Sequence, residues 1–198
     1  MTSSRPVKLS RDVDAIEIPS GASKTLRSGS TVRLMQSRGG SHTVTAADTG
    51  AMYRIDEKHA DALGLATPPP DPGPASGPLT DKLISDQLKT VFDPEIPINI
   101  LELGLVYSCV SSPLKEGGNR IDVKMTLTAP GCGMSDVLKA DVESKLSRLP
   151  TVKQVHVEVV FDPPWHPGLM SEAARLQLGF EPEADKEAPV FPIYRPKT

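Results

Sequence analysis

Arg120-Ile-Asp-Val-Lys-Met-Thr-Leu-Thr-Ala-Pro-Gly-Cys-Gly-Met134 is the stretch that decides the fold of the second half of this chain. Apolar residues occupy every second position from Ile121 to Leu127, which predicts a β-strand with one buried face. Its polar residues, through Thr126, are expected on the opposite face. A glycine-rich turn follows, and apolar residues then recur at the four-residue spacing of an amphipathic helix: Met134, Leu138, Val142 and Leu146. The stretch therefore predicts a strand, a turn and a helix in succession.

Further elements are expected on both sides of this stretch. Thr80 is placed to cap a helix that ends before Pro94, since proline cannot continue the hydrogen-bond ladder. The remaining elements are a helix over 81–92, strands over 105–111 and 155–161, and a short helix between Ser171 and Gly179. This order predicts an α+β fold, in which a small mixed sheet of about three strands carries helices on one face.

Proline content marks the domain organisation. Residues 67–78 contain six prolines and two glycines, a composition typical of an extended linker. The linker separates a small β-rich N-terminal region, 15–66, from an α/β domain over 79–180. A proline-rich tail over 181–198 is expected to be poorly ordered.

The overall composition narrows the classes of function. The formal net charge of −3 offers no basic field for nucleic acid, and no apolar run reaches the roughly 18 residues of a membrane span. The start of the chain lacks the apolar core of a signal peptide, which favours a cytoplasmic location. The sequence has no Ser-His-Asp set and no glycine-rich phosphate loop, so we expect a protein that is not an enzyme and holds no tightly bound cofactor.

Cys132 is the strongest candidate for a functional residue. Gly131 and Gly133 have no side chains and would leave the thiol open to a ligand. The start of the following helix would lower the pKa of the thiol and favour the thiolate, the form that binds metal. The competing interpretation is a small residue buried at a tight turn. Cys109 lies in an apolar strand, where a free cysteine usually serves core packing.

Two stiff, proline-framed loops each carry a carboxylate. Asp93 and Glu95 lie in the first loop, and Asp162 lies in the second, which ends at Trp165. A simple helix stop or strand exit is the more common role of such a loop, and the alternative is that each loop fixes an acid close to Cys132. Burial against the core is the default expectation for Trp165, the only tryptophan.

Four separated motifs resemble the metal–sulfur cluster biosynthesis family, also called MIP18 or DUF59. They are Asp93-Pro-Glu-Ile-Pro-Ile-Asn99, Leu103-Gly-Leu-Val-Tyr107, Thr126-Leu-Thr-Ala-Pro-Gly-Cys-Gly-Met134 and Asp162-Pro-Pro-Trp165. The N-terminal Gly39-Gly-Ser-His-Thr-Val44 extends the resemblance to the SufT-type branch.

This resemblance implies a fold related to the NifU C-terminal domain and an accessory role in iron–sulfur cluster assembly. It implies that Cys132 is the functional thiol, supported by positions matching Asp93, Glu95 and Thr128. The expected partners are a Suf-type scaffold or carrier and apo client proteins, and the expected cargo is transient iron or an iron–sulfur cluster. Because one cysteine cannot hold a cluster alone, Cys132 would share it with a partner or within a homodimer.

Two other functions stay open. The first is a protein–protein adaptor in which Cys132 is structural. The second is a thiol redox or persulfide carrier, for which Cys109 is the only internal resolving thiol.

Overall fold

The computed structural model describes residues 6–66, 77–129, 133–180 and 193–194. Cys132 and Gly131, most of the predicted linker and most of the predicted tail lie outside these residues. The chain forms two compact units. Unit 1 comprises Met1–Pro72, Pro94–Pro97 and Cys132–Asp136, and unit 2 comprises Gly73–Asp93, Ile98–Gly131 and Val137–Thr198.

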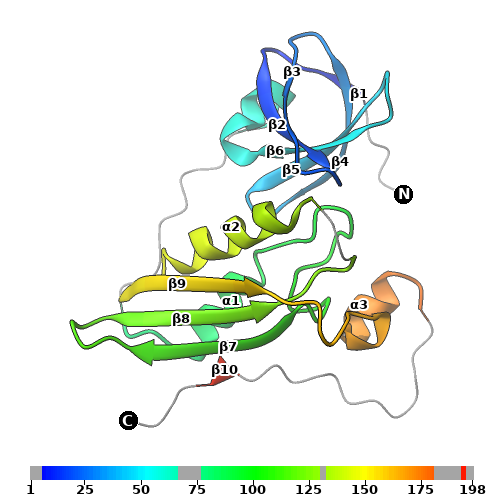
Figure 1. Ribbon diagram of the computed structural model, residues 1–198. Helices are drawn as coiled ribbons and strands as arrows, with labels where there is room; N and C mark the ends of the chain where they lie inside the picture. The colour runs from blue at the N-terminus through cyan, green and yellow to red at the C-terminus, as the bar shows by residue number, and fades with distance from the viewer. Residues whose placement is uncertain (1–5, 67–76, 130–132, 181–192, 195–198) are drawn as a thin grey trace. The chain divides into compact units, whose positions relative to one another are not determined.

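Unit 1 is built on a strongly curved antiparallel sheet, hereafter the N-terminal sheet (Figure 1). Its strand order is β1-β4-β5-β6-β2-β3. The strands are β1 (Pro6–Lys8), β2 (Val13–Ile18), β3 (Ser23–Leu26), β4 (Thr31–Arg38), β5 (Ser41–Ala46) and β6 (Met52–Asp56), followed by a 3-10 helix (Glu57–Leu63). The β-rich character predicted for this region is confirmed, and the sheet begins nine residues before the expected start at residue 15.

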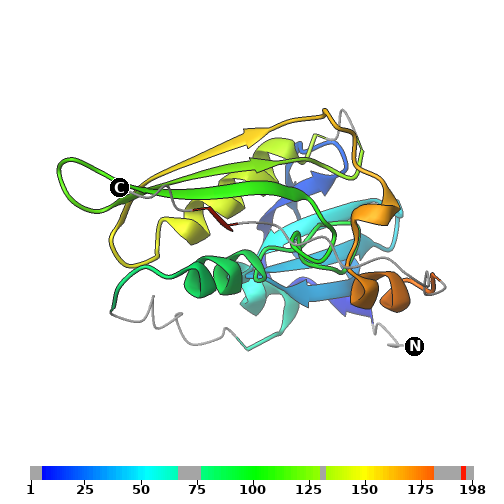
Figure 2. The same cartoon turned by 90° about the horizontal axis from the view of Figure 1, so that it is seen from below.

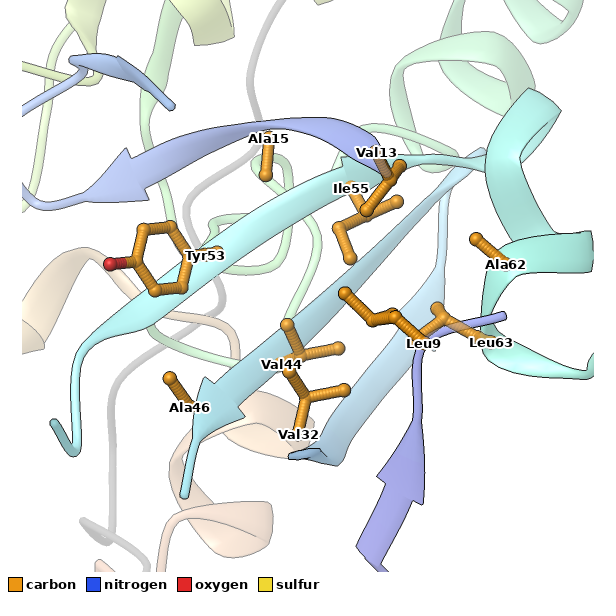
Figure 3. Packing of buried hydrophobic residues seen from close by; sticks show 10 residues of the cluster. All are labelled: Leu9, Val13, Ala15, Val32, Val44, Ala46, Tyr53, Ile55, Ala62 and Leu63. Carbon is orange, nitrogen blue, oxygen red and sulfur yellow. The ribbon is translucent and has the colours of Figure 1, made fainter. Parts of the chain in front are cut away.

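The N-terminal sheet encloses a hydrophobic core of its own (Figure 3). Val32, Val44 and Ile55 are fully buried in this core, and Leu63 of the 3-10 helix packs with them. Burying a side chain of this size contributes roughly 1.5–3 kcal/mol. The core therefore holds β4, β5 and β6 in one stable arrangement.

Unit 2 is built on a mixed sheet in the order β10-β7-β8-β9. Its strands are β7 (Val106–Pro113), β8 (Asn119–Met125), β9 (Val152–Val159) and β10 (Ile193–Tyr194). β7 and β8 form an antiparallel hairpin, and β9 pairs with β8 in parallel. The predicted mixed sheet is confirmed, with the two-residue strand β10 added beside β7 by the segment expected to be a tail.

The helices of unit 2 are α1 (Asp81–Leu88), α2 (Ser135–Leu146) and α3 (Glu172–Gln177). α1 and α2 lie on the same side of the β7–β8–β9 sheet (Figure 2). Thr80 caps α1 by accepting a hydrogen bond from the Leu83 N–H at 3.2 Å, as the sequence predicts. The predicted extension of α1 to residue 92 is wrong, because Lys89 and Thr90 turn back onto the last helical carbonyls. No helix in the described residues is long and apolar enough to span a membrane.

The apolar positions of β8 point into the core of unit 2. Ile121, Val123 and Met125 are at most 1% exposed, which confirms the predicted buried face. Thr126 departs from the alternation, since it is 1% exposed although the pattern places it with the polar residues. β8 ends at Met125, so the alternation of side chains no longer applies at Thr126.

Candidate functional site

The loop that carries Asp93 and Glu95 has a closed base. The backbone N–H of Asp93 donates to the Ile98 carbonyl at 3.1 Å, and Phe92 and Asn99 form an antiparallel bridge. Asp93 is 5% exposed, whereas Glu95 is exposed. The two carboxylates of this loop therefore have different environments, and they belong to different compact units.

The tip of this loop belongs to unit 1. The Thr43 hydroxyl on β5 donates a hydrogen bond to the Pro94 carbonyl at 3.4 Å. Thr43 is only 5% exposed although its strand neighbour Val44 fills the core on the other face. The backbone of the loop tip is thus held from the N-terminal sheet.

The turn between β8 and α2 is described up to Ala129 and again from Gly133. Thr128 is half-buried and Gly133 is exposed. Met134 is 2% exposed, so it anchors the turn to a hydrophobic environment just before α2 begins at Ser135. The helix start falls at the predicted place, three residues after Cys132 in the chain.

Gly133 lies against a turn of the N-terminal sheet. A Cβ built on Gly133 would lie 2.0 Å from the Ser20 carbonyl oxygen, a distance that real side chains do not adopt. The space beside Gly133 is therefore filled by backbone. In the sequence analysis, Gly133 is interpreted as leaving the thiol accessible. In the structure, a glycine is required at this position because the Ser20 backbone lies too close for a side chain.

Trp165 fixes the segment after β9 to the segment before β7. Its indole N–H donates to the Leu103 carbonyl at 2.7 Å, and the ring is half-buried. Nearby, the Tyr107 hydroxyl donates to the Pro163 carbonyl at 2.7 Å. Both contacts are within unit 2, which gives Trp165 a structural role in addition to any part in a site.

Burial makes the Cys109 thiol chemically unreactive. Its side chain is 2% exposed, and it is a free cysteine on β7. Burial in the apolar core, with smaller contributions from the negative charges of Asp81 and Asp122, raises the pKa of the Cys109 thiol to about 12. A thiol of this kind is almost entirely protonated at neutral pH and is a poor nucleophile and metal ligand.

Within residues 6–66, 77–129, 133–180 and 193–194, no group of three or more His, Cys, Asp or Glu residues is placed to hold a metal ion. Of the predicted site residues, Glu95 and Gly133 fall in unit 1, while Asp93, Thr128 and Trp165 fall in unit 2.

Sequence reasoning missed three residues near these loops. Thr126 is fully buried, and its hydroxyl has no hydrogen-bond partner in the described part of the chain. Thr43 and Gly21 contact the two loops from the N-terminal sheet. Thr126 lies in a family motif, which could have identified it. No sequence pattern links residues 21 or 43 to loops more than 50 positions away.

Comparison with known proteins places these loops in a family context. Residues 82–159 match the family described as iron–sulfur cluster assembly protein. The chain is 41% identical over 102 residues to a "Fe-S protein maturation auxiliary factor" of Porphyromonas gingivalis, covering 51% of this chain and 92% of that relative. It is 38% identical over 89 residues to the "Fe-S protein maturation auxiliary factor SufT" of Staphylococcus aureus, covering 45% of this chain and 97% of that relative. A DUF59 domain structure from Bacillus anthracis is 36% identical, with a TM-score of 0.45 over 51% of this chain and 92% of that chain.

Proposed function

The chain belongs to the iron–sulfur cluster assembly protein family, and we propose that it is a non-catalytic accessory factor that helps deliver clusters to client proteins. The observation that carries the proposal is the match over residues 82–159, which includes the whole turn from Thr126 to Met134. The relatives named as maturation auxiliary factors support the same role. We place this activity in the cytoplasm, with a Suf-type scaffold or carrier and apo clients as partners.

Cys132 is the residue proposed to touch the cargo. The chain has two cysteines, and the burial of Cys109 leaves Cys132 as the thiol able to form a thiolate near neutral pH. Iron–sulfur clusters in proteins are generally held by four thiolates. One Cys132 per chain would therefore ligate iron or a cluster edge transiently, with the other ligands supplied by a carrier or by a second copy of the chain.

Asp93, Glu95 and Thr128 are proposed to support this thiol, as the family resemblance implies, and Gly131 is proposed to leave it open to a ligand. Asp93 is buried and Glu95 is exposed, so the two carboxylates would play different parts. The exposed Glu95 is suited to meet a partner or a metal ion that arrives from solution. The buried Asp93 is suited to fix the loop.

A protein–protein adaptor is the second candidate, and one observation favours it. Three large apolar side chains are exposed at the end of α3 and just beyond it: Leu176, Leu178 and Phe180. Neighbouring exposed apolar residues of this size often mark protein contacts. The third alternative, a redox or persulfide carrier, is weakened because Cys109 is too buried to act as the resolving thiol.

The deciding experiment compares three variants as the only copy in cells. Activity of an aconitase-type cluster enzyme is measured together with the abundance of the variant and of the client. We expect Cys132→Ala and Cys132→Ser to lower the activity to that of a deletion at normal abundance. Cys109→Ala serves as the matched thiol control and should retain activity. Wild-type activity of the client enzyme with Cys132→Ala would favour the adaptor function instead. In that case the double variant Leu176→Glu and Phe180→Glu should abolish the client activity.

A further inference from the structure

The two sides of the mixed sheet in unit 2 differ in charge. β9 forms one edge of the sheet and carries three exposed residues that are charged or titratable, Lys153, His156 and Glu158. β7 lies toward the opposite edge and contains no Asp, Glu, Lys or Arg over its eight residues. Charged side chains, lysine above all, are a device by which an edge strand avoids pairing with another chain. β9 has this protection, and β7 lacks it.

β10 lies on the outer side of β7 (Figure 1). The two strands pair in parallel, with Ile193 opposite Cys109 and Tyr194 opposite Val110. Within the residues that the structure describes, β10 is the only strand on this side of β7. The backbone N–H and C=O groups along the outer edge of a strand are a template for a further strand. The position of β10 shows that the outer edge of β7 accepts an extended segment.

β10 covers only part of this edge. It pairs with two residues of an eight-residue strand. The sequence gives a reason for this short pairing, because Pro192 precedes Ile193 and Pro196 follows Arg195. Proline has no N–H group and is poorly tolerated within a sheet. A segment without these two prolines would therefore be able to pair with more of β7 than β10 does.

The register of the sheet offers a comparison between its two sides. Asp122 on β8 pairs with Val110 on β7 and with His156 on β9. Paired residues point to the same face, so these three side chains share the face opposite to the buried Cys109. Val110 is half-buried and His156 is exposed. At equivalent positions, β7 therefore presents an apolar side chain where β9 presents a titratable one.

We propose that the outer edge of β7 is a docking site for an extended segment of a partner protein, and that Ile193 and Tyr194 occupy this edge until the partner arrives. The partner's segment runs parallel to β7, as β10 does, and hydrogen-bonds to its backbone. β-branched and aromatic residues suit the centre of this segment, because they favour strands and because β10 consists of one of each. The proposal goes beyond the function proposed above, since it stands on the strands of unit 2 and requires no role for Cys132.

The tail and the partner's segment compete for the same edge. A segment in the same chain has a high effective concentration at its site, which lowers the apparent affinity of any segment that arrives from solution. Loss of the pairing between β10 and β7 must therefore strengthen the binding of an added peptide. This gain in affinity is the result that the experiment is designed to detect.

The test uses the full chain and two proline substitutions in its tail. Ile193→Pro removes a backbone N–H from β10 and disrupts its pairing with β7. Thr198→Pro places the same residue outside β10 and serves as the matched control. The probe is a fluorescein-labelled peptide with the sequence of residues 189–198, in which P192A and P196A remove the flanking prolines. Fluorescence anisotropy measures its affinity for the wild type and for each variant.

We expect the peptide to bind Ile193→Pro at least about tenfold more tightly than it binds the wild type or Thr198→Pro, because the competing strand is lost. The same peptide with its native prolines should bind more weakly, since it pairs with fewer residues of β7. Absence of binding to Ile193→Pro, or equal affinity for all three proteins, would overturn the proposal.

Hydrogen exchange locates the bound peptide on the sheet. In Ile193→Pro, a saturating amount of the peptide should slow amide exchange in residues 106–113, which form β7, and leave residues 152–159 of β9 unchanged. Protection of β9 in place of β7 would show that the peptide binds the other edge, and the proposed site would be wrong.

A second pair of variants, made in the Ile193→Pro chain, tests the edge itself. Val110→Lys and His156→Lys each place an ammonium group opposite Asp122, the first on β7 and the second on β9. Val110→Lys should weaken peptide binding by about tenfold, because it gives β7 the kind of charge that protects β9. His156→Lys should bind the peptide as well as Ile193→Pro alone. Equal binding by the two lysine variants would contradict a site on β7.

A second copy of the chain is the alternative occupant of this edge. Sedimentation velocity without peptide should give Ile193→Pro the same oligomeric state as the wild type. If Ile193→Pro instead gains a subunit and no longer binds the peptide, the edge serves self-association, and the proposal of a partner segment falls.

Discussion

The indole N–H of Trp165 donates a hydrogen bond to the main-chain carbonyl of Leu103, with 2.7 Å between Nε1 and the oxygen. The two residues are 62 positions apart, and each lies in a motif of the family resemblance. Leu103 is fully buried, so its carbonyl has little access to water. This hydrogen bond therefore connects two of the family motifs in the folded protein.

Trp165→Phe should lower the free energy of unfolding by about 1–3 kcal/mol, because it leaves the Leu103 carbonyl without its donor. Urea unfolding followed by circular dichroism measures this change. Phenylalanine keeps most of the aromatic packing, so the loss reports mainly on the hydrogen bond. An unchanged urea midpoint would mean that water replaces the indole.

Tyr107→Phe should have a smaller effect than Trp165→Phe. The Tyr107 hydroxyl donates to the Pro163 carbonyl, but Pro163 is exposed and its carbonyl can bond to water instead. A loss below about 1 kcal/mol is expected in the same urea experiment. A loss as large as that of Trp165→Phe would show that the Pro163 carbonyl is shielded from water.

Cys109 should resist alkylation in the folded protein. With a pKa of about 12, roughly one Cys109 thiol in ten thousand is ionised at pH 8, and only the thiolate reacts readily. In the Cys132→Ala variant, iodoacetamide should therefore modify Cys109 at least about a hundredfold more slowly in buffer than in urea. Intact mass spectrometry follows the reaction. Comparable rates in buffer and urea would contradict the burial of this thiol.

His42 should make the N-terminal sheet sensitive to acid. Burial lowers the pKa of His42, against a smaller opposing effect of Glu57 and Asp56. Its Nδ1 lies 2.7 Å from the Ser37 hydroxyl, and its Nε2 has no hydrogen-bond partner among the described residues. The folded state therefore resists protonation of this ring.

The sign of the pH effect follows from this lowered pKa. As the pH falls below the ordinary histidine value of about 6.5, the unfolded chain binds a proton that the folded chain refuses. Stability contributed by neutral His42 is present above that pH and is lost on acidification. His42→Leu should reduce the loss of stability between pH 7 and pH 5, measured by urea unfolding. An identical loss in wild type and variant would assign the acid sensitivity to other groups.

Local patterns were enough to predict most of unit 2. The alternation from Ile121 to Met125 and the four-residue spacing of Leu138, Val142 and Leu146 each reflect burial of one face of one element. Thr80 was identified as a cap because its bond to Leu83 is local. The end of α1 at Leu88 was missed, since the N–H groups of Lys89 and Thr90 turn back onto the last helical carbonyls before Pro94 is reached.

The candidate site was only partly predictable. The sequence motifs identify Asp93, Glu95, Thr128 and Cys132 as residues of interest, but they do not tell which carboxylate is buried. The contact between β5 and the carboxylate loop joins residues 51 positions apart, and no pattern in either segment predicts this contact.

By itself, the sequence determined the α+β class, the strand–turn–helix unit around Cys132 and the family, because these depend on periodicity and motifs within short segments. Only the tertiary structure decided that Gly133 packs against Ser20 and Gly21 and that Thr43 binds the Pro94 carbonyl. The physical reason is that close packing is a property of surfaces brought together by the fold. Glycine and threonine carry no signal of which distant backbone they will meet.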